Sequence, residues 1–158
     1  MRVLKFLLVL FSVLVAGCTV PMGKSVGELD ASYTGQQLVV YRPLDKGGLY
    51  FPGVLNGKEL KSSLTRGSVV LEGLPEGPSK FTVVLPPLQP GSVVKANVLA
   101  FDTKPGERKF IRVRLVNFEE SAGLTFLLGP GIGTWTFAVE EVDPATAVAE
   151  IRDLKFAN

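Results

Sequence analysis

The sequence predicts an all-β protein, an antiparallel β-sandwich followed by a short C-terminal helix. From residue 36 onward, short runs of alternating apolar and polar residues are separated by glycine and proline at intervals of roughly 8–12 residues. An Asn-Gly pair at residues 56–57 is the strongest short signal for a β-hairpin, because a type I′ turn needs positive φ at both central positions. About seven to nine strands of this length fit a single sandwich.

The first half of this region contains strands with one apolar face. The first strand is ended by Pro43, and the second contains Pro52, which favours a sheet edge or a bulge because proline cannot donate to a ladder. In the last of them Phe81, Val83 and Leu85 share a face. The predicted strands are residues 38–42, 49–55, 58–64, 68–72 and 79–85, with the last two paired across the turn at 74–78.

The second half continues in the same style. Residues 93–101 are predicted to pair with residues 109–117, where Ile111 and Val113 face one way and Arg112 the other, as in a strand with one solvated face. Asp143 before Pro144 indicates a helix N-cap and a first helical position. A last hairpin is predicted from residues 124–128 and 134–142, and a helix from residues 145–154.

The N-terminus has the layout of a secretory signal. Arg2 and Lys5 precede an apolar run over residues 6–15, and small residues follow. Residues 1–17 are therefore predicted to be a signal-peptide helix, since the run is shorter than the roughly 20 residues of a spanning helix. An ordinary signal peptide with a chance cysteine, or a membrane-anchor helix, remain as alternatives.

The end of this signal, Leu14-Val15-Ala16-Gly17-Cys18, resembles the lipobox of bacterial lipoproteins. The resemblance implies cleavage before Cys18 and its acylation, including palmitate, so that the membrane becomes a partner through the acyl chains. Thr19 follows where such lipoproteins retained at the inner membrane commonly carry Asp, which implies the periplasmic face of the outer membrane. Residues 18–35 are predicted to be a tether and residues 36–158 a single domain.

Three motifs of the domain occur in a fixed order. Tyr41-Arg42-Pro43 ends the first strand, an Asn56-Gly57 hairpin follows, and a Leu74-Pro75-Glu76-Gly77 turn comes next. In this order the motifs resemble those of a family of small bacterial envelope domains of unknown function. The resemblance covers about residues 36–152 and implies an immunoglobulin-like or prealbumin-like sandwich, mostly in lipoproteins. The glycine-rich, apolar stretch at residues 129–133 departs from it.

Composition excludes several chemistries. The chain has no histidine and one cysteine, so serine–histidine catalysis and histidine or cysteine metal sites are excluded once Cys18 is acylated. Removal of Arg2 and Lys5 takes the 17 basic residues to 15, equal to the 15 acidic ones, so no nucleic-acid partner is expected. We expect no cofactor, no metal and no catalytic residue.

The candidate site residues other than Cys18 are Tyr41 and Arg42, which lie on opposite faces of the first strand. An arginine beside apolar neighbours needs a carboxylate, and Glu140, Glu141 and Glu150 are the predicted partners. A structural role is favoured over a ligand-binding one.

Two functions are carried forward. The first is a non-catalytic binding or structural module at the membrane, with an envelope protein or peptidoglycan as its partner. The alternative is a carboxylate-dependent hydrolase of an envelope glycan, which would need two carboxylates from separate strands, because the adjacent pairs Glu119-Glu120 and Glu140-Glu141 each face opposite ways. The uncharged stretch 121–139 is interpreted as two buried strands, with a membrane span or an exposed apolar loop as alternatives.

Overall fold

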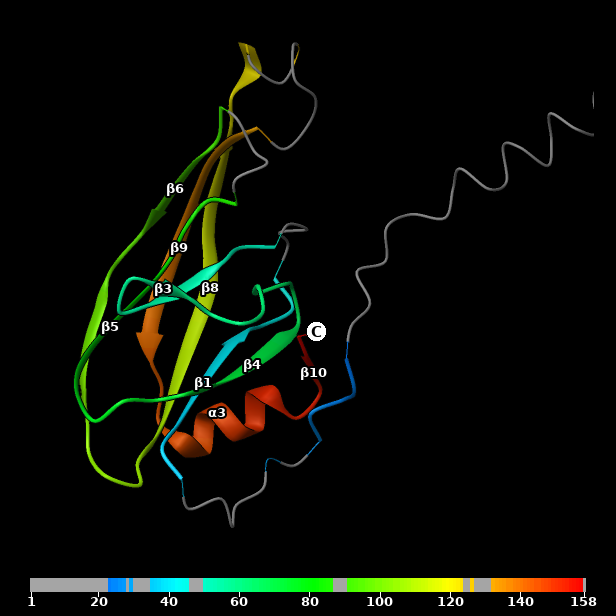
Figure 1. Cartoon of the computed structure of the whole chain (residues 1–158). Coiled ribbons are helices and arrows are strands. Elements are labelled where there is room, and N and C mark those ends of the chain that lie inside the picture. The colour runs from blue at the N-terminus through cyan, green and yellow to red at the C-terminus, as the bar shows by residue number, and fades with distance from the viewer. Residues whose placement is uncertain are drawn as a thin grey trace, which may run out of the picture.

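The computed structural model describes residues 23–27, 29, 35–45, 50–86, 91–123, 126 and 132–157. Over these residues the chain forms two β-sheets, with one α-helix across the outer face of the larger sheet (Figure 1). The predicted all-β sandwich and its short C-terminal helix are confirmed. The predicted signal-peptide helix and Cys18 lie outside the described residues.

The described residues contain a six-stranded sheet of order β10-β4-β1-β8-β9-β6 and a four-stranded sheet of order β3-β2-β5-β7. The elements are β1 (Gln37–Arg42), β2 (Gly53–Leu55), β3 (Lys58–Glu59), β4 (Ser68–Gly73), β5 (Gly77–Val83), β6 (Val93–Ala96), β7 (Leu99–Thr103), β8 (Arg108–Glu120), β9 (Gly133–Glu141), α3 (Pro144–Ile151) and β10 (Lys155–Phe156).

The larger sheet is mixed, although the sequence predicted antiparallel pairing. Strand β1 pairs antiparallel with β4 but parallel with β8, and the pairs β4–β10 and β6–β9 are also parallel. The smaller sheet is antiparallel throughout. Parallel neighbours need long crossover connections, so they leave no local mark in the sequence.

Two predicted hairpins are wrong, the one between residues 68–72 and 79–85 and the one between residues 93–101 and 109–117. Strands β4 and β5 are consecutive but belong to different sheets, and so do β7 and β8. The single strand predicted at residues 93–101 is two strands, one in each sheet. The chain changes sheet at Asn97, whose side chain donates to the carbonyl of Val139 at 2.7 Å and accepts from its amide at 2.8 Å. The Asn97 side chain thus takes the place of the backbone hydrogen bonds at the point where the chain, after β6, separates from its partner β9.

The predicted Asn-Gly hairpin is confirmed. Asn56 and Gly57 have φ values of 50° and 81°, the left-handed region that a type I′ turn requires. They join β2 to β3, and the Asn56 side chain also accepts a hydrogen bond from the Lys80 amide at 2.8 Å. The turn is therefore fastened to the neighbouring strand β5.

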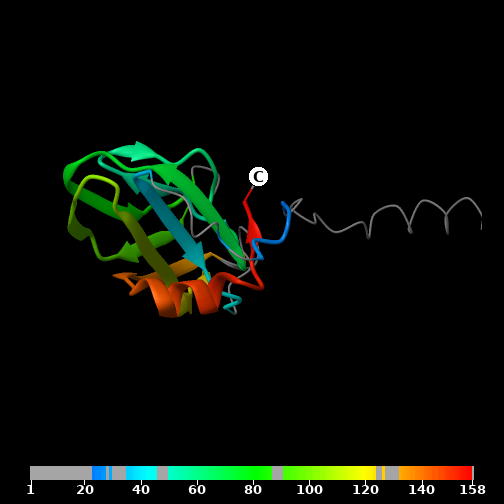
Figure 2. The same cartoon turned by 90° about the horizontal axis from the view of Figure 1, so that it is seen from below.

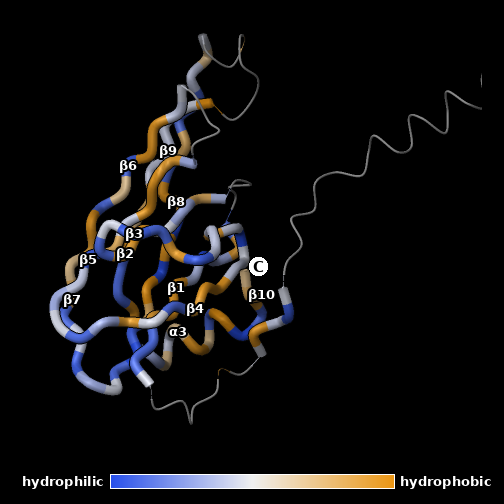
Figure 3. Tube along the Cα trace, in the orientation of Figure 1, coloured by the Kyte–Doolittle hydropathy of each residue, from blue (hydrophilic) through white to orange (hydrophobic). Residues whose placement is uncertain are grey.

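The main core lies between the two sheets. Figure 3 shows hydrophobic stretches along the strands of the sandwich. Phe51 packs against Phe137 and Trp135, with ring centroids 4.6 and 5.5 Å apart. Other buried members of this cluster are Leu38, Val40, Leu55, Leu60, Leu64, Val70, Leu74, Phe81, Val83, Ile111, Val113 and Val139.

A second core lies between the larger sheet and α3, which crosses the outer face of that sheet in Figure 2. The alternate residues of β1, Val39 and Tyr41, face the helix residues Ala147 and Ile151 in this cluster. Asp143 caps the helix by accepting from the Thr146 amide at 3.0 Å, and Pro144 stands in its first turn. The N-cap prediction is confirmed.

The described part of the predicted tether is paired with the domain instead of free. Ser25 forms an isolated antiparallel bridge with Lys155 of β10, and the buried side chain of Val26 joins the helix-side core. The N-terminal segment lies beside the last strand in Figures 1 and 2. An extended segment can therefore cover the edge of the larger sheet.

Of the uncharged stretch 121–139, the described residues 133–139 belong to β9, whose alternate side chains are buried. This agrees with the buried-strand interpretation of that half. The other half, residues 124–128, lies outside the described residues except Phe126, which is 91% exposed. Within the described part of the chain, no helix is long and apolar enough to cross a membrane.

Candidate functional site

Tyr41 lies beneath α3 on the outer face of the larger sheet. Its side chain is fully buried among Val39, Val69 and the helix residue Ile151. Its hydroxyl donates a hydrogen bond to the Glu150 carboxylate. Burial, and then the hydrogen bond and negative charge of Glu150, raise the pKa of Tyr41 well above its usual value of 10.0. The hydroxyl is therefore held in its neutral, donating form.

Arg112 links the same carboxylate to β9. Its Nε donates to Glu140 at 3.0 Å, and its Nη1 binds Glu150. Burial lowers the pKa of Arg112, but its hydrogen bond to Glu140 and the negative charges of both glutamates outweigh that effect and raise the pKa. Tyr41, Arg112, Glu140 and Glu150 are named here the outer cluster. Its members come from β1, β8, β9 and α3, so it fastens the helix to three strands.

Arg42 points the other way, into the main core. Its side chain is 0% exposed, and its guanidinium carbon lies 5.5 Å from the ring centroids of both Phe51 and Phe137. Asp45 accepts two hydrogen bonds from it, from Nε at 2.9 Å and from Nη2 at 2.8 Å. Asp45 also accepts from the Leu115 amide at 3.3 Å. A bidentate pair between aromatic rings is well suited to arginine and poorly suited to lysine.

The prediction that Arg42 meets a carboxylate is confirmed, but the predicted partners are wrong. Glu140 and Glu150 bind Arg112 on the opposite face of the sheet, and Glu141 binds Lys109 at 2.9 Å. The carboxylate was expected on a distant segment, at Glu140, Glu141 or Glu150, whereas Asp45 follows Arg42 by only three residues. Pro43 ends the strand, and the Asp45 amide donates to the Pro43 carbonyl at 2.8 Å, so the chain turns back over the arginine. A carboxylate just after a strand-ending proline was the available signal.

The carboxylates named for a hydrolase do not converge within their adjacent pairs. Glu140 and Glu141 bind different cations on opposite faces of β9, and Glu119 accepts from the Asn117 amide group at 3.0 Å. Glu140 and Glu150 do come together, but on the guanidinium of Arg112. The described residues hold no group of three or more carboxylates that could hold a metal ion.

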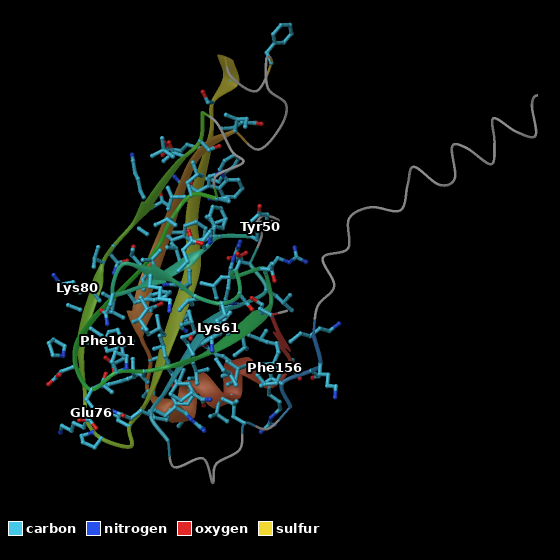
Figure 4. All side chains as sticks on the ribbon, viewed as in Figure 1. Tyr50, Lys61, Glu76, Lys80, Phe101 and Phe156 are labelled. Atoms are coloured by element: carbon cyan, nitrogen blue, oxygen red, sulfur yellow. The ribbon has the colours of Figure 1, made fainter. Side chains whose placement is uncertain are left out.

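One hollow lies beside the β2–β3 hairpin and has a volume of about 340 Å³. Its apolar lining includes Leu55 and Leu60, and Lys61, labelled in Figure 4, lines it with its Nζ 3.6 Å from the Glu72 carboxylate. Lys58 and Glu59 also line it. The two cations and two carboxylates balance each other, so the hollow carries no net charge that would select an anion or a cation.

No family model, no curated protein and no solved structure matches this chain.

Replacement of Tyr41 by Phe tests the outer cluster through pH. The folded protein keeps the Tyr41 proton above pH 10, where the unfolded chain releases it, so unfolding is favoured as pH rises. The wild type should therefore lose free energy of unfolding faster than Tyr41→Phe above about pH 10, with a limiting difference of about 1.4 kcal/mol per pH unit. Below that pH the variant should be about 1–3 kcal/mol less stable.

Urea unfolding at pH 8, 10 and 11 measures both effects. Tyr50→Phe is the matched control, because Tyr50 is 37% exposed. If the free energy of unfolding falls equally fast with pH in the wild type and in Tyr41→Phe above pH 10, the buried hydroxyl does not keep its proton.

Proposed function

We propose that this chain is a bacterial lipoprotein, held on the periplasmic face of the outer membrane by acyl chains on Cys18. Its sandwich is a non-catalytic binding or structural module that meets an envelope protein or peptidoglycan. The observation that carries the proposal is the sequence Leu14-Val15-Ala16-Gly17-Cys18 at the end of a basic and then apolar N-terminus. More than one acyl chain, at roughly 0.8 kcal/mol per buried CH₂, makes such an anchor stable.

Several charged side chains of the domain bind one another, and this supports a non-catalytic module. Arg42 is satisfied by Asp45 inside the core, and the outer cluster satisfies Arg112, Glu140 and Glu150 within the domain. A catalytic acid or base must be available to a substrate proton, so each of these groups would first have to leave its partner. The hydrolase alternative therefore receives no support from the carboxylates that converge.

Replacement of Cys18 by Ala is expected to abolish lipid attachment, because alanine has no thiol to accept a diacylglyceryl group. In cells fed labelled palmitate, the wild type should carry the label and fractionate with membranes. The variant should carry none and should remain as uncut precursor or soluble periplasmic protein. Label that persists in Cys18→Ala would contradict the proposal.

Thr19→Asp is the matched control. It keeps Cys18 and should keep the palmitate label, but it should move the protein from the outer to the inner membrane. Crosslinking and pull-down of the lipidated wild type from its own envelope then identifies the partner, with Cys18→Ala as the comparison. A partner that depends on membrane attachment should be recovered only with the wild type.

A further inference from the structure

The paired N-terminal segment Gly23–Gly27, named here the strap, is held to the C-terminal strand by backbone hydrogen bonds. The Gly23 amide donates to the Phe156 carbonyl at 2.9 Å, and the Val26 amide donates to the Leu154 carbonyl at 2.9 Å. The Phe156 amide donates back to the Lys24 carbonyl at 3.0 Å. Phe156 itself lies near α3 (Figure 4). The strap is therefore an added edge strand of the domain.

Val26 is the buried side chain of the strap, and Leu29, two residues beyond the strap, is partly buried against the same helix-side core. Val26 is 7% exposed and packs in the cluster that contains Ile151 and Leu154. The other side chains of the strap are exposed, and Gly27 has a φ of 57°, a turn conformation that favours glycine. The rest of that cluster is held by α3 and the larger sheet. Release of the chain up to β1 therefore removes Val26, the partly buried Leu29 and a few edge hydrogen bonds, and leaves both sheets intact.

The strap fixes how far the domain stands from Cys18. Four residues separate Cys18 from Gly23, so the two Cα atoms lie at most about 18 Å apart. With the strap and Leu29 both released, the first fixed residue is Gln37 at the start of β1, and the limit rises to about 65 Å. A flexible chain of that length spans about 24 Å on average.

We propose that the strap is a two-state spacer that sets the distance of the domain from the membrane. When paired, it keeps the β10 edge at the lipid surface. When released, it lets the same folded domain reach a partner several tens of ångströms away. This inference rests on the proposed acylation of Cys18, because only an anchored Cys18 turns the length of free chain into a distance from the membrane.

The rate of cleavage by trypsin reports whether the strap is paired or released. Lys24 is the only lysine or arginine between Cys18 and Arg42, and Arg42 is fully buried. A cut after Lys24 therefore releases the domain from vesicles into solution. Proteases need an extended, unpaired chain, so the lipidated wild type in phosphatidylethanolamine and phosphatidylglycerol vesicles should be released slowly.

Val26→Asp should release the domain at least about tenfold faster, because a buried apolar side chain is replaced by a charge. Val116→Asp is the matched control, because Val116 is 61% exposed on β8, and its release rate should equal that of the wild type. The single tryptophan, Trp135, gives a second readout. Energy transfer from Trp135 to a dansyl lipid should fall in Val26→Asp.

A disulfide that locks the strap in its paired state tests the opposite change to release. Ser25 and Lys155 face each other as a pair flanked by the hydrogen bonds of their neighbours, a geometry with Cα atoms about 4.5 Å apart. That separation suits a disulfide. Oxidised Ser25→Cys/Lys155→Cys should resist release by trypsin until reductant is added, and its energy transfer should be at least that of the wild type.

Three results would overturn the spacer. They are release of the wild type as fast as that of Val26→Asp, failure of the two cysteines to form the disulfide, and energy transfer that is the same in the locked and released forms. Failure of the lipid anchor is distinguishable, since unacylated protein would not bind the vesicles. Cutting after Lys24 would then be followed by mass, and the pairing of the strap would still be measured.

Discussion

Arg42→Ala is expected to lower the free energy of unfolding by about 3–5 kcal/mol, because it leaves the Asp45 carboxylate near the core without its bidentate partner. It also removes a side chain that fills the space between Phe51 and Phe137. Asp45→Asn should cost a comparable amount, because it removes the negative charge that balances a fully buried guanidinium. Urea unfolding at pH 7 measures both changes.

The double variant Arg42→Met/Asp45→Leu should cost less than the sum of Arg42→Met and Asp45→Leu measured singly, because no unpaired charge is left behind. Arg66→Ala is the control, since Arg66 is an exposed arginine of the turn before β4, and it should change stability by less than about 0.5 kcal/mol. If Arg42→Ala also stays within that range but abolishes a partner found by pull-down, Arg42 belongs to a binding site.

Gly133→Ala is expected to lower the free energy of unfolding by roughly 3 kcal/mol or more, at or above the upper end for overpacking. A Cβ at Gly133 would lie 2.1 Å from the carbonyl oxygen of Glu119 and 3.0 Å from the Cα of Glu120. Both atoms belong to the backbone of β8, so no side chain can rotate away. The end of the β8–β9 pairing would have to open.

Gly73→Ala is the matched control, because a Cβ there meets nothing within 4 Å and Gly73 has no positive φ. It should be neutral or slightly stabilising. Fluorescence of Trp135, two residues beyond Gly133, should report the local opening. A Gly133→Ala protein as stable as the wild type would mean that β8 and β9 are farther apart at this point.

Local chemistry explains what could be predicted from the sequence. The Asn56-Gly57 turn and the cap at Asp143 each need specific residues within a few positions, and both were found. The alternation of Ile111, Arg112 and Val113 likewise determines which side of β8 is buried. The glycine at position 133 stood out as unusual, and its reason, contact with the backbone of Glu119, depends on a partner strand that the sequence does not identify.

The assignment of strands to sheets could not be predicted, because it depends on contacts between distant segments. The turns after β4 and β7 look like hairpin turns but carry the chain across the sandwich. The strap was missed for a related reason. Val26 is one apolar residue among glycine, serine and lysine, and the strap is distinguished from a tether by the burial of Val26 and by backbone pairing with the distant C-terminal strand.

The parallel pairs of the larger sheet have a consequence for the order in which the protein can fold. β1 occupies the middle of that sheet, but its parallel partner begins at Arg108, so half of its backbone groups stay unpaired until the chain is made that far. β4 waits longer still for β10. Closing such long loops costs chain entropy before stabilising contacts form, so this step is slow. We expect folding in about milliseconds to seconds. The edges of β1 and β4 therefore stay open to pairing with other chains until the C-terminal half has been made.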